Sequence, residues 1–326
     1  MPGAATSRTL LILGATAAGK SALALELAQR RRAEIVSLDS MQVYRGMDIG
    51  TAKPSPAERR LVPHHLVDVL DVAEHSDVAA YLDRVRRAEQ AAAARGARPI
   101  LVGGTAMYIK ALVDGLFEGP AASAAIRAEL LATADEHGSA YLHEHVLKPV
   151  DSATAARVHP NDLRRIVRAI EVFRLTGRPL SEHQRQWDEQ DAQCAYAMAG
   201  LTMPRDELYR RIDARVDAMM AAGLLDEVDA LRAKGIEQNP SAAQAIGYKE
   251  LLAHLRGECD CARAVELIKR NTRRFAKHQL TWFRKDRRIS WFDVTLFADA
   301  AKLADAVEEW LEGGAAMTSA PPERLK

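Results

Sequence analysis

A short glycine-containing segment near the amino end constrains the fold of this chain more than any other feature of its sequence. The segment follows the apolar run Thr9 to Leu13 and precedes a helical pattern that begins near Lys20. It matches the pattern GxxxxGK[ST] with the residues Gly14, Ala15, Thr16, Ala17, Ala18, Gly19, Lys20 and Ser21. A strand, this loop and a helix in that order predict a P-loop, whose backbone N–H groups and helix N-terminus bind phosphate.

The residues of this loop have distinct predicted roles. The whole segment is expected to bind a chain of two or more phosphates, with Lys20 as a point charge and Ser21 as a ligand for Mg²⁺. ATP is the usual ligand of such a loop, but any diphosphate ester would satisfy the same donors. A nucleotide hydrolase would also carry an acid at the end of an apolar strand to hold the metal. Here the run that ends at Val102 is followed by Gly103-Gly104-Thr105.

Further short apolar runs predict a parallel sheet around the P-loop. Glu34 to Leu38 ends at Asp39, and Pro99 to Val102 ends at Gly103, with a helical pattern from Val78 to Arg95 between them. Alternating strands and helices favour right-handed crossovers, which place ligands beyond the carboxyl ends of the strands. We therefore expect the P-loop, Asp39 and the glycines after Val102 to meet at one edge of the sheet.

The strand pattern stops in the middle of the chain and returns later. Between Pro120 and Cys194 the sequence favours helices, and sheet character reappears at Tyr196 to Leu201 and at Ser290 to Phe292. We predict an α/β protein whose core consists of residues 1–119 and 195–312. A mainly helical insertion occupies 120–194, and a disordered tail occupies 313–326.

Composition excludes several classes of protein. The 326 residues carry a formal net charge of +1, and no apolar run approaches the roughly 20 residues that a membrane span needs. The three cysteines, Cys194, Cys259 and Cys261, support neither a disulfide framework nor a four-ligand zinc site. We expect a cytoplasmic protein with no membrane-embedded part and no uniformly basic surface, and we expect it to be a monomer.

A polar loop follows the second apolar run. It extends from Asp39 to Pro54 and contains Gly46 and Gly50. Loops at this edge of a parallel sheet usually hold substrate. From its position alone, Asp39 is a candidate base for a nucleophile that attacks next to the phosphates, a ligand for Mg²⁺ or a helix cap.

Six segments resemble the tRNA dimethylallyltransferase family, also called the IPP transferase family, and together they cover most of the chain. They are GATAAGKS at Gly14, DSMQVYRGMDIGTAKP at Asp39, LVGGTAMYIKAL at Leu101, HPNDLRRIVRAIEVFRLTG at His159, AIGYKEL at Ala245 and KRNTRRFAKHQLTWFRKD at Lys269. The resemblance implies a P-loop nucleotide-kinase-like core with a helical insertion domain. It also implies transfer of the dimethylallyl group of dimethylallyl diphosphate to N6 of an adenosine. This is the adenosine at position 37, on the 3′ side of the anticodon, in tRNAs that read codons beginning with U.

Catalytic roles follow from the resemblance residue by residue. Asp39 would accept the proton from adenine N6, while Thr16, Lys20, Ser21 and Mg²⁺ stabilise the departing diphosphate. Arg211 and Arg215 lie four residues apart on one predicted helix, in the region where the family places an arginine that anchors the diphosphate. A solvated helix face is the alternative role for either arginine.

The resemblance also implies how tRNA is held. The acceptor base must leave its stack to reach a buried carboxylate, and a basic segment with interleaved aromatic residues suits the RNA phosphates. The basic residues are Lys269, Arg270, Arg273, Arg274, Lys277, Arg284, Lys285, Arg287 and Arg288. The residues expected to contact tRNA are Asp39, Ser40, Met41, Gln42, Thr105, Arg127, Leu163, Arg164, Arg165, Ile166, Val167, Gln244, Gly247, Lys249 and Lys277. Taken alone, the basic segment could equally be a helix face that is balanced by acids elsewhere in the fold.

Three other functions are compatible with parts of this sequence. An adenylate prenyltransferase would share the P-loop and Asp39 but needs no RNA-binding surface, so the basic segment and the insertion favour tRNA. A small-molecule kinase would hold ATP in the loop, and the missing acid after Val102 disfavours it. Intact Lys20, Ser21 and Asp39 disfavour a noncatalytic RNA-binding module. We interpret Met219-Met220 and Leu224-Leu225 as core residues rather than as a prenyl pocket.

Overall fold

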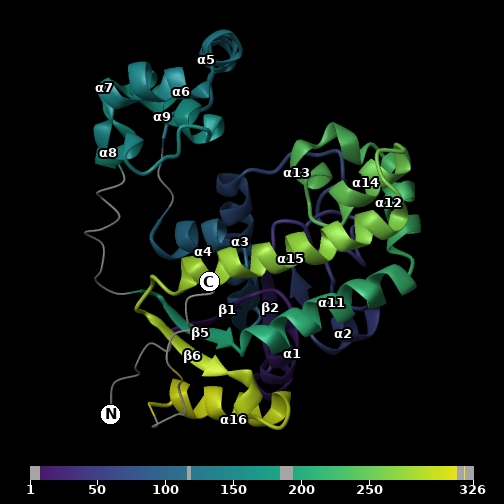
Figure 1. Ribbon diagram of the computed structural model, residues 1–326. Coiled ribbons are helices and arrows are strands. Elements are labelled where there is room, and N and C mark those ends of the chain that lie inside the picture. The colour runs from purple at the N-terminus through teal and green to yellow at the C-terminus, as the bar shows by residue number, and fades with distance from the viewer. Residues whose placement is uncertain (1–7, 116–118, 184–193, 314–318, 320–326) are drawn as a thin grey trace, which may run out of the picture. The chain divides into compact units, whose positions relative to one another are not determined.

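The chain folds into two compact units, which the computed structural model describes for residues 8–115, 119–183, 194–313 and 319 (Figure 1). The core unit comprises 1–113 and 195–326, and the insertion unit comprises 114–194. The chain leaves the core unit at the end of α4 (Ala106–Val113), earlier than the predicted boundary after residue 119. Pro120, which suggested that boundary, already lies inside the insertion unit, where its carbonyl accepts a hydrogen bond from Arg168.

Six parallel strands form the sheet in the described part of the core unit. Across the sheet they are β3 (His64–His65), β2 (Ala33–Leu38), β4 (Arg98–Gly103), β1 (Thr9–Gly14), β5 (Tyr196–Thr202) and β6 (Ile289–Asp293). The predicted apolar runs form five of these strands, which confirms the α/β class with a parallel sheet. The short edge strand β3 is not predicted, because two adjacent histidines form no apolar run.

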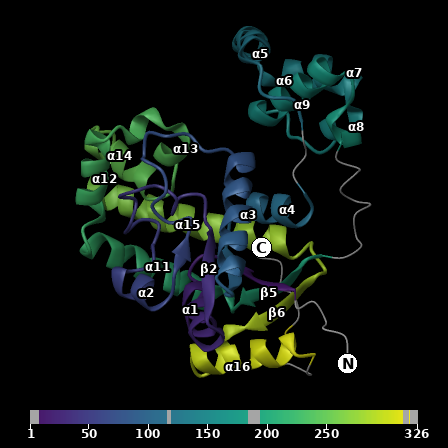
Figure 2. The ribbon, with the colours of Figure 1, turned by 180° about the vertical axis from the view of Figure 1, so that it is seen from behind.

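Helices cover both faces of the sheet. In the views of Figures 1 and 2, α1 (Lys20–Arg31) and α16 (Ala300–Leu311) lie below it, and α4 and α15 (Cys261–Phe283) lie above it. Further helices of the core unit are α2 (Pro56–Leu61), α3 (Val78–Ala94), α11 (Arg205–Ala221), α12 (Leu224–Ala233), α13 (Pro240–Ala243) and α14 (Tyr248–Leu255). Among the described residues, no helix is both long enough and apolar enough to cross a membrane.

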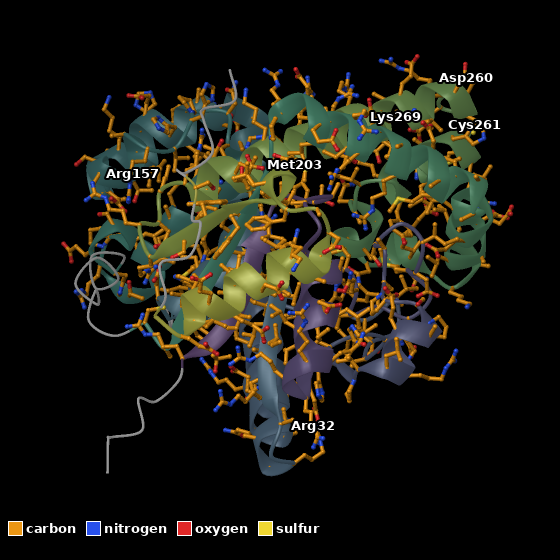
Figure 3. The ribbon with its side chains drawn as sticks, turned by 90° about the horizontal axis from the view of Figure 1, so that it is seen from below. Arg32, Arg157, Met203, Asp260, Cys261 and Lys269 are labelled. Atoms are coloured by element: carbon orange, nitrogen blue, oxygen red, sulfur yellow. The ribbon has the colours of Figure 1, made fainter. Side chains whose placement is uncertain are left out.

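Most of the predicted basic segment lies on the long helix α15. Figure 3 labels Asp260 and Cys261 at its start and Lys269 further along, and the Asp260 carboxylate caps the helix by accepting the Arg263 N–H at 2.7 Å. Lys269 and Arg273 form ion pairs with Asp217 and Asp213 of α11, each at 2.6 Å. These two basic side chains therefore fix α15 to α11. For these two residues, the pairing agrees with the alternative interpretation of the basic segment, in which acids elsewhere in the fold balance its charge.

The predicted tail falls largely outside the described residues. Of 313–326, the structure describes Gly313 and Ser319 alone. The Ser319 N–H donates a hydrogen bond to the Trp291 carbonyl at 2.6 Å, so this residue meets strand β6.

The insertion unit is helical in its described part. It contains α5 (Ala124–His137), α6 (Ser139–Tyr141), a π-helical turn (Leu142–Leu147), α7 (Lys148–Val150), α8 (Ser152–Ala155) and α9 (Leu163–Thr176). Leu130, Leu142, Leu147, Ile166 and Ile170 form the centre of its own hydrophobic core. The unit thus buries its own apolar side chains, as a separate domain does.

A buried carboxylate connects α9 to the start of α5. Glu171 is fully buried and accepts hydrogen bonds from the Ser123 N–H, from Arg127 Nε and Nη2, and from Arg168 Nη1, at 2.7 to 3.0 Å. Burial opposes ionisation, but the hydrogen bonds from the two arginines and Ser123 prevail and hold the pKa of Glu171 at about 2. Arg127, an expected tRNA contact, is therefore engaged inside the insertion unit.

We expect Glu171→Gln to destabilise the insertion unit by about 2–3 kcal/mol, because an amide offers one acceptor oxygen to four donors. Since the pKa of Glu171 is lowered by folding, its stabilising contribution is complete above about pH 4.5 and is lost as the pH falls toward 2. Hydrogen exchange of the α9 amides in the full chain measures the loss. The control is Glu129→Gln, which breaks an exposed ion pair with Arg174 and should leave exchange unchanged. Equal protection in the two variants would contradict this role.

Candidate active site

A pocket of about 750 Å³ opens at the carboxyl ends of β1, β2 and β4. Residues of the P-loop, of the segments that follow β2 and β4, and of helices α11 and α15 line it. All of these residues belong to the core unit. The three sequence features expected to meet at one sheet edge, the P-loop, Asp39 and Gly103-Gly104-Thr105, therefore do so.

The P-loop connects β1 to α1 in the predicted way. A side chain at Gly14 would place its Cβ 2.6 Å from the Leu201 carbonyl oxygen on β5, so this position requires glycine. Lys20 Nζ donates to the Gly14 and Ala15 carbonyls at 3.0 and 2.7 Å. Burial and the nearby charge of Arg215 lower the pKa of Lys20 to about 8, while Asp39 acts in the opposite direction.

Asp39 follows β2 directly and faces the same pocket. Its Oδ1 accepts hydrogen bonds from the Met41 and Gln42 N–H groups at 2.8 and 3.4 Å, whereas Oδ2 has no hydrogen bond to any described residue. Burial raises the pKa of Asp39, and these two N–H groups together with Lys20 and Arg215 oppose the rise. One carboxylate oxygen thus caps the turn and the other is available to a ligand.

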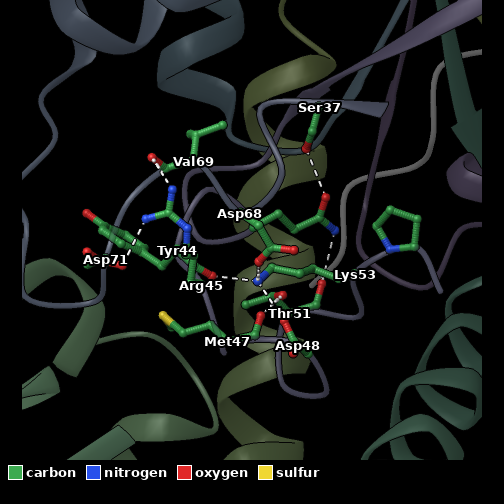
Figure 4. Close-up of polar contacts among 12 residues, drawn as sticks. Ser37, Tyr44, Arg45, Met47, Asp48, Thr51, Lys53, Asp68, Val69 and Asp71 are labelled. Carbon is green, nitrogen blue, oxygen red and sulfur yellow. Dashed lines mark hydrogen bonds and ion pairs between the residues drawn. The ribbon is translucent and has the colours of Figure 1, made fainter. Parts of the chain in front are cut away.

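The loop after Asp39 is held by its own polar side chains. Gln42 accepts a hydrogen bond from Ser37 Oγ at 2.9 Å and donates to the Thr51 and Ala52 carbonyls at 3.1 and 3.4 Å. Figure 4 shows Lys53 at the centre of the loop, where Nζ donates to the Tyr44 carbonyl at 2.5 Å and contacts Asp48 and Asp68 at 2.7 and 2.5 Å. These contacts make the loop a fixed wall of the pocket.

The two candidate arginines of α11 have different surroundings. Arg211 Nε donates to Glu207 Oε1 at 2.7 Å, one turn earlier on the same helix. Arg215 has neither a hydrogen bond nor an ion pair with any residue in the described ranges, and its charge acts on Lys20 and Asp39. Burial lowers the pKa of Arg215, and Asp39 opposes this effect. Of these two arginines, Arg215 is therefore the one whose guanidinium is not paired with a described carboxylate.

A comparison with known protein families identifies the family of this chain. A family model described as IPP transferase matches residues 42–286. The chain belongs to the IPP transferase family.

Similar proteins agree with this membership over nearly the whole chain. The tRNA dimethylallyltransferase of Geobacter sulfurreducens is 50% identical over 295 residues, which are 90% of this chain and 94% of that protein. The enzyme of the same name from Symbiobacterium thermophilum is 51% identical over 293 residues, 88% of this chain and 89% of that protein.

Solved structures give the same result. The tRNA isopentenylpyrophosphate transferase of Bacillus halodurans superposes with a TM-score of 0.68 at 40% identity, covering 94% of this chain and 97% of that one. A eukaryotic dimethylallyltransferase acting on tRNA superposes with a TM-score of 0.78 at 26% identity, covering 96% of this chain and 82% of that one.

The expected tRNA-contacting residues of this IPP transferase family member are spread over both units. Asp39, Ser40, Met41, Gln42, Thr105, Gln244 and Gly247 line the pocket. In the insertion unit, Arg164 and Arg165 are exposed, Leu163 is half-buried, and Ile166 and Val167 are buried in the core. The side chains of Ile166 and Val167 therefore pack inside the insertion unit and are not available to RNA. In the core unit, Lys249 is exposed and Lys277 is half-buried.

Sequence reasoning missed one polar residue of this IPP transferase site, Gln279 of α15. Its side chain is 4% exposed, accepts the Thr16 N–H at 2.9 Å and donates to the Gly104 carbonyl at 2.8 Å. It thus joins the P-loop to the segment after β4, and a Cβ on Gly104 would lie 2.3 Å from its Nε2. The available signal was an uncharged polar residue beside the buried stripe Ala276, Leu280 and Phe283.

We expect Gln279→Met to weaken binding of Mg²⁺ and inorganic diphosphate about tenfold. The variant keeps the side-chain volume but leaves the Thr16 N–H and the Gly104 carbonyl without their partner, so the P-loop loses its fixed position. Isothermal titration calorimetry measures the change. Lys277→Met, on the same helix, is the matched control and should bind diphosphate as the unchanged protein does. Equal affinity in both variants would show that Gln279 does not position the loop.

The site fits Mg²⁺ as a partner of bound phosphates in this IPP transferase family member. Among the described residues, no group of three or more His, Cys, Asp or Glu side chains could hold a metal ion by itself. Mg²⁺ commonly keeps several waters and binds through one or two protein ligands plus substrate phosphates. Ser21 lines the pocket at the start of α1, and a hydroxyl is a ligand of the kind that this mode of binding requires.

Proposed function

We propose that this protein transfers a dimethylallyl group from dimethylallyl diphosphate to N6 of the adenosine at position 37 of tRNAs that read codons beginning with U, and that it releases diphosphate. One observation carries the proposal. A carboxylate, Asp39, and two cations, Lys20 and Arg215, line one pocket and influence one another electrostatically. Membership in the IPP transferase family supports the prenyl donor and the tRNA acceptor.

The P-loop would hold the diphosphate of the donor. The backbone of Gly14–Ser21 would surround its oxygens, and Lys20 would exchange its bonds to the loop carbonyls for bonds to phosphate. Arg215 would bind the same group from α11, and Thr16 lines the pocket on the loop side. Mg²⁺, held by the Ser21 hydroxyl and the diphosphate, would supply further positive charge for the leaving group.

The five-carbon chain would lie against an apolar wall. Ile212, Val216 and Met219 of α11 line the pocket together with Leu224 of α12. Our sequence interpretation assigned Met219 and Leu224 to the core, and Leu224 is fully buried there, but both residues also border the pocket. The helical spacing is the same for a core stripe and a pocket wall, so periodicity could not separate the two roles.

Asp39 would act on the acceptor amine. N6 of adenine forms a bond to the allylic carbon, the bond from that carbon to the diphosphate oxygen breaks, and the electron pair leaves with the diphosphate. The free Oδ2 of Asp39 accepts the N6 proton, and the raised pKa of this buried carboxyl makes it a stronger base than an exposed aspartate. The positively charged groups around the P-loop stabilise the charge that develops on the leaving group.

A single base of the RNA would leave its stack and enter the pocket. A stacked adenine cannot contact a buried carboxylate, so the base turns out of the anticodon loop into the pocket. Exposed basic residues of the segment after Lys269, among them Arg270, Arg274 and Lys285, would bind phosphates, and Arg164 and Arg165 offer further positive charge on the insertion unit. We propose that the protein acts as a monomer, and in the cytoplasm.

The test supplies labelled dimethylallyl diphosphate and Mg²⁺ with an unmodified anticodon stem-loop, AMP or ATP as acceptor. Label in the stem-loop alone, lost when the adenosine at position 37 is replaced by guanosine, is the expected result. RNA binding should also weaken as the salt concentration rises. Label in AMP would identify an adenylate prenyltransferase, and consumption of ATP without transfer of label would identify a kinase. Stem-loops that read codons beginning with other bases test the tRNA subset.

A further inference from the structure

The loop that follows Asp39 forms one wall of the pocket. A residue of helix α12 binds this loop and holds it in place. The segment Gly50–Pro54 lines the pocket, and the Gln42 side chain binds the carbonyls of Thr51 and Ala52. Gln42 also bonds to Ser37, two residues before Asp39. Gln42 therefore connects the loop to strand β2, two residues before Asp39.

Glu227, in the first turn of α12, binds the outer side of this loop. Its Oε2 accepts hydrogen bonds from the N–H groups of Asp48 and Ile49 at 3.0 and 2.7 Å. Its Oε1 accepts the Gly50 N–H at 3.2 Å and the Tyr248 hydroxyl at 2.6 Å. Two carboxylate oxygens thus satisfy four donors, three of which belong to consecutive residues of the loop.

Tyr248 completes this group of contacts. Its side chain is fully buried at the start of α14, and a Cβ on Gly50 would lie 2.6 Å from its ring. Burial and the charge of Glu227 raise the pKa of Tyr248, so its hydroxyl stays a hydrogen-bond donor. Gly50 is therefore confined between a ring that admits no side chain and a carboxylate that binds its N–H.

We propose that Glu227 is a positioning residue of the active site. Its carboxylate fixes Asp48–Gly50, and through Gln42 it fixes the backbone around Asp39, so that the acceptor adenine meets a preformed wall. The inference rests on the proposed function for the identity of the acceptor. Glu227 contacts neither the P-loop nor Asp39 itself, so its role concerns the acceptor and not the diphosphate.

The variant Glu227→Gln tests the positioning role, because glutamine has nearly the same side-chain size as glutamate. An amide has one acceptor oxygen, and its NH₂ group must face two of the four donors, so the loop loses one or two of its three bonds to α12. We expect hydrogen exchange of the amides at 48–50 to rise about tenfold or more. The KM for the anticodon stem-loop should rise about tenfold, while the affinity for Mg²⁺ and inorganic diphosphate stays unchanged.

Three further variants keep the test decisive. Asp229→Asn, on the same helix, breaks an exposed pair with Arg232 at 3.1 Å and should change neither exchange nor KM. Tyr248→Phe removes one donor and leaves the three loop bonds to Glu227, so its KM effect should be smaller than that of Glu227→Gln. Should Glu227→Gln fail to fold, Glu227→Asp takes its place, because its shorter side chain cannot keep all of the loop bonds, and an unchanged KM for the stem-loop in that variant would overturn the proposal.

Unchanged exchange at 48–50, or an unchanged KM for the stem-loop, would overturn the positioning role. A parallel loss of diphosphate affinity would also overturn it, because the effect would then not be confined to the acceptor side. Failure of the proposed function would look different. The unchanged protein would transfer no label to the stem-loop, and the exchange measurement would still decide whether Glu227 fixes the loop.

Discussion

Replacing Asp39 with asparagine is expected to lower kcat for prenyl transfer about 10³-fold, because an amide cannot accept the proton that adenine N6 must lose. The variant should still fold, since its side-chain oxygen can accept the Met41 and Gln42 N–H groups as Oδ1 does now. Removing a negative charge beside Lys20 and Arg215 should leave diphosphate binding intact or make it tighter. Single-turnover transfer of labelled prenyl group to the stem-loop measures the effect.

The pH dependence of the same reaction is a second test of Asp39 as the base. Because burial raises the pKa of this carboxyl above its ordinary value of 3.8, activity of the unchanged protein should fall on the acid side at a pH above that value. The Asp39→Asn variant should not show this fall in activity on the acid side, which we call the acid limb. Asp48→Asn, which alters an exposed carboxylate paired with Lys53, serves as the control and should keep the limb. A loss of less than about tenfold in Asp39→Asn would remove this residue from the role of base.

Replacing Arg215 with methionine is expected to lower kcat about 10²-fold, because the charge on the leaving diphosphate loses one of its fixed partners. Methionine keeps much of the apolar stem against the neighbouring Ile212 and Val216, so the helix should fold as before. Arg211→Met is the matched control one turn away. It breaks an ion pair with Glu207 on a partly exposed face and should stay within about threefold of the unchanged protein.

Steady-state kinetics with dimethylallyl diphosphate and calorimetry with inorganic diphosphate separate the two arginines. Arg215→Met should lower both kcat and diphosphate affinity, and the pKa of Lys20 should rise once the neighbouring positive charge is gone. If Arg211→Met proved the more damaging change, the diphosphate would be anchored by the arginine that the structure pairs with Glu207, and our assignment would be wrong.

Local sequence patterns were sufficient for the central features of the fold. The P-loop and the strand ends at Asp39 and Gly103 follow from short apolar runs and glycines, which depend on neighbouring residues only. Their convergence follows from the rule that parallel strands end at one edge. The class of the fold and the place of the pocket could therefore be predicted from the sequence.

The remaining site residues depend on contacts between distant segments. Arg211 and Arg215 are equivalent in sequence, and only the position of Glu207 and of the P-loop distinguishes them. Gln279 and Glu227 are ordinary polar residues of helices until the fold brings them to backbone groups of other segments. Ile166 and Val167 lie within a resemblance motif, but the 3.6-residue period of α9 turns them into the core of the insertion unit.

The discontinuous core unit dictates the order in which a nascent chain can assemble this site. Strand β1 pairs on one side with β4 and on the other with β5, which leaves the ribosome only after the whole insertion unit has been made. The hydrogen bond from Thr16 to Gln279 joins residues 263 positions apart. The insertion unit is contiguous and can fold during synthesis, whereas the phosphate-binding loop acquires the support of Gln279 only when α15 emerges.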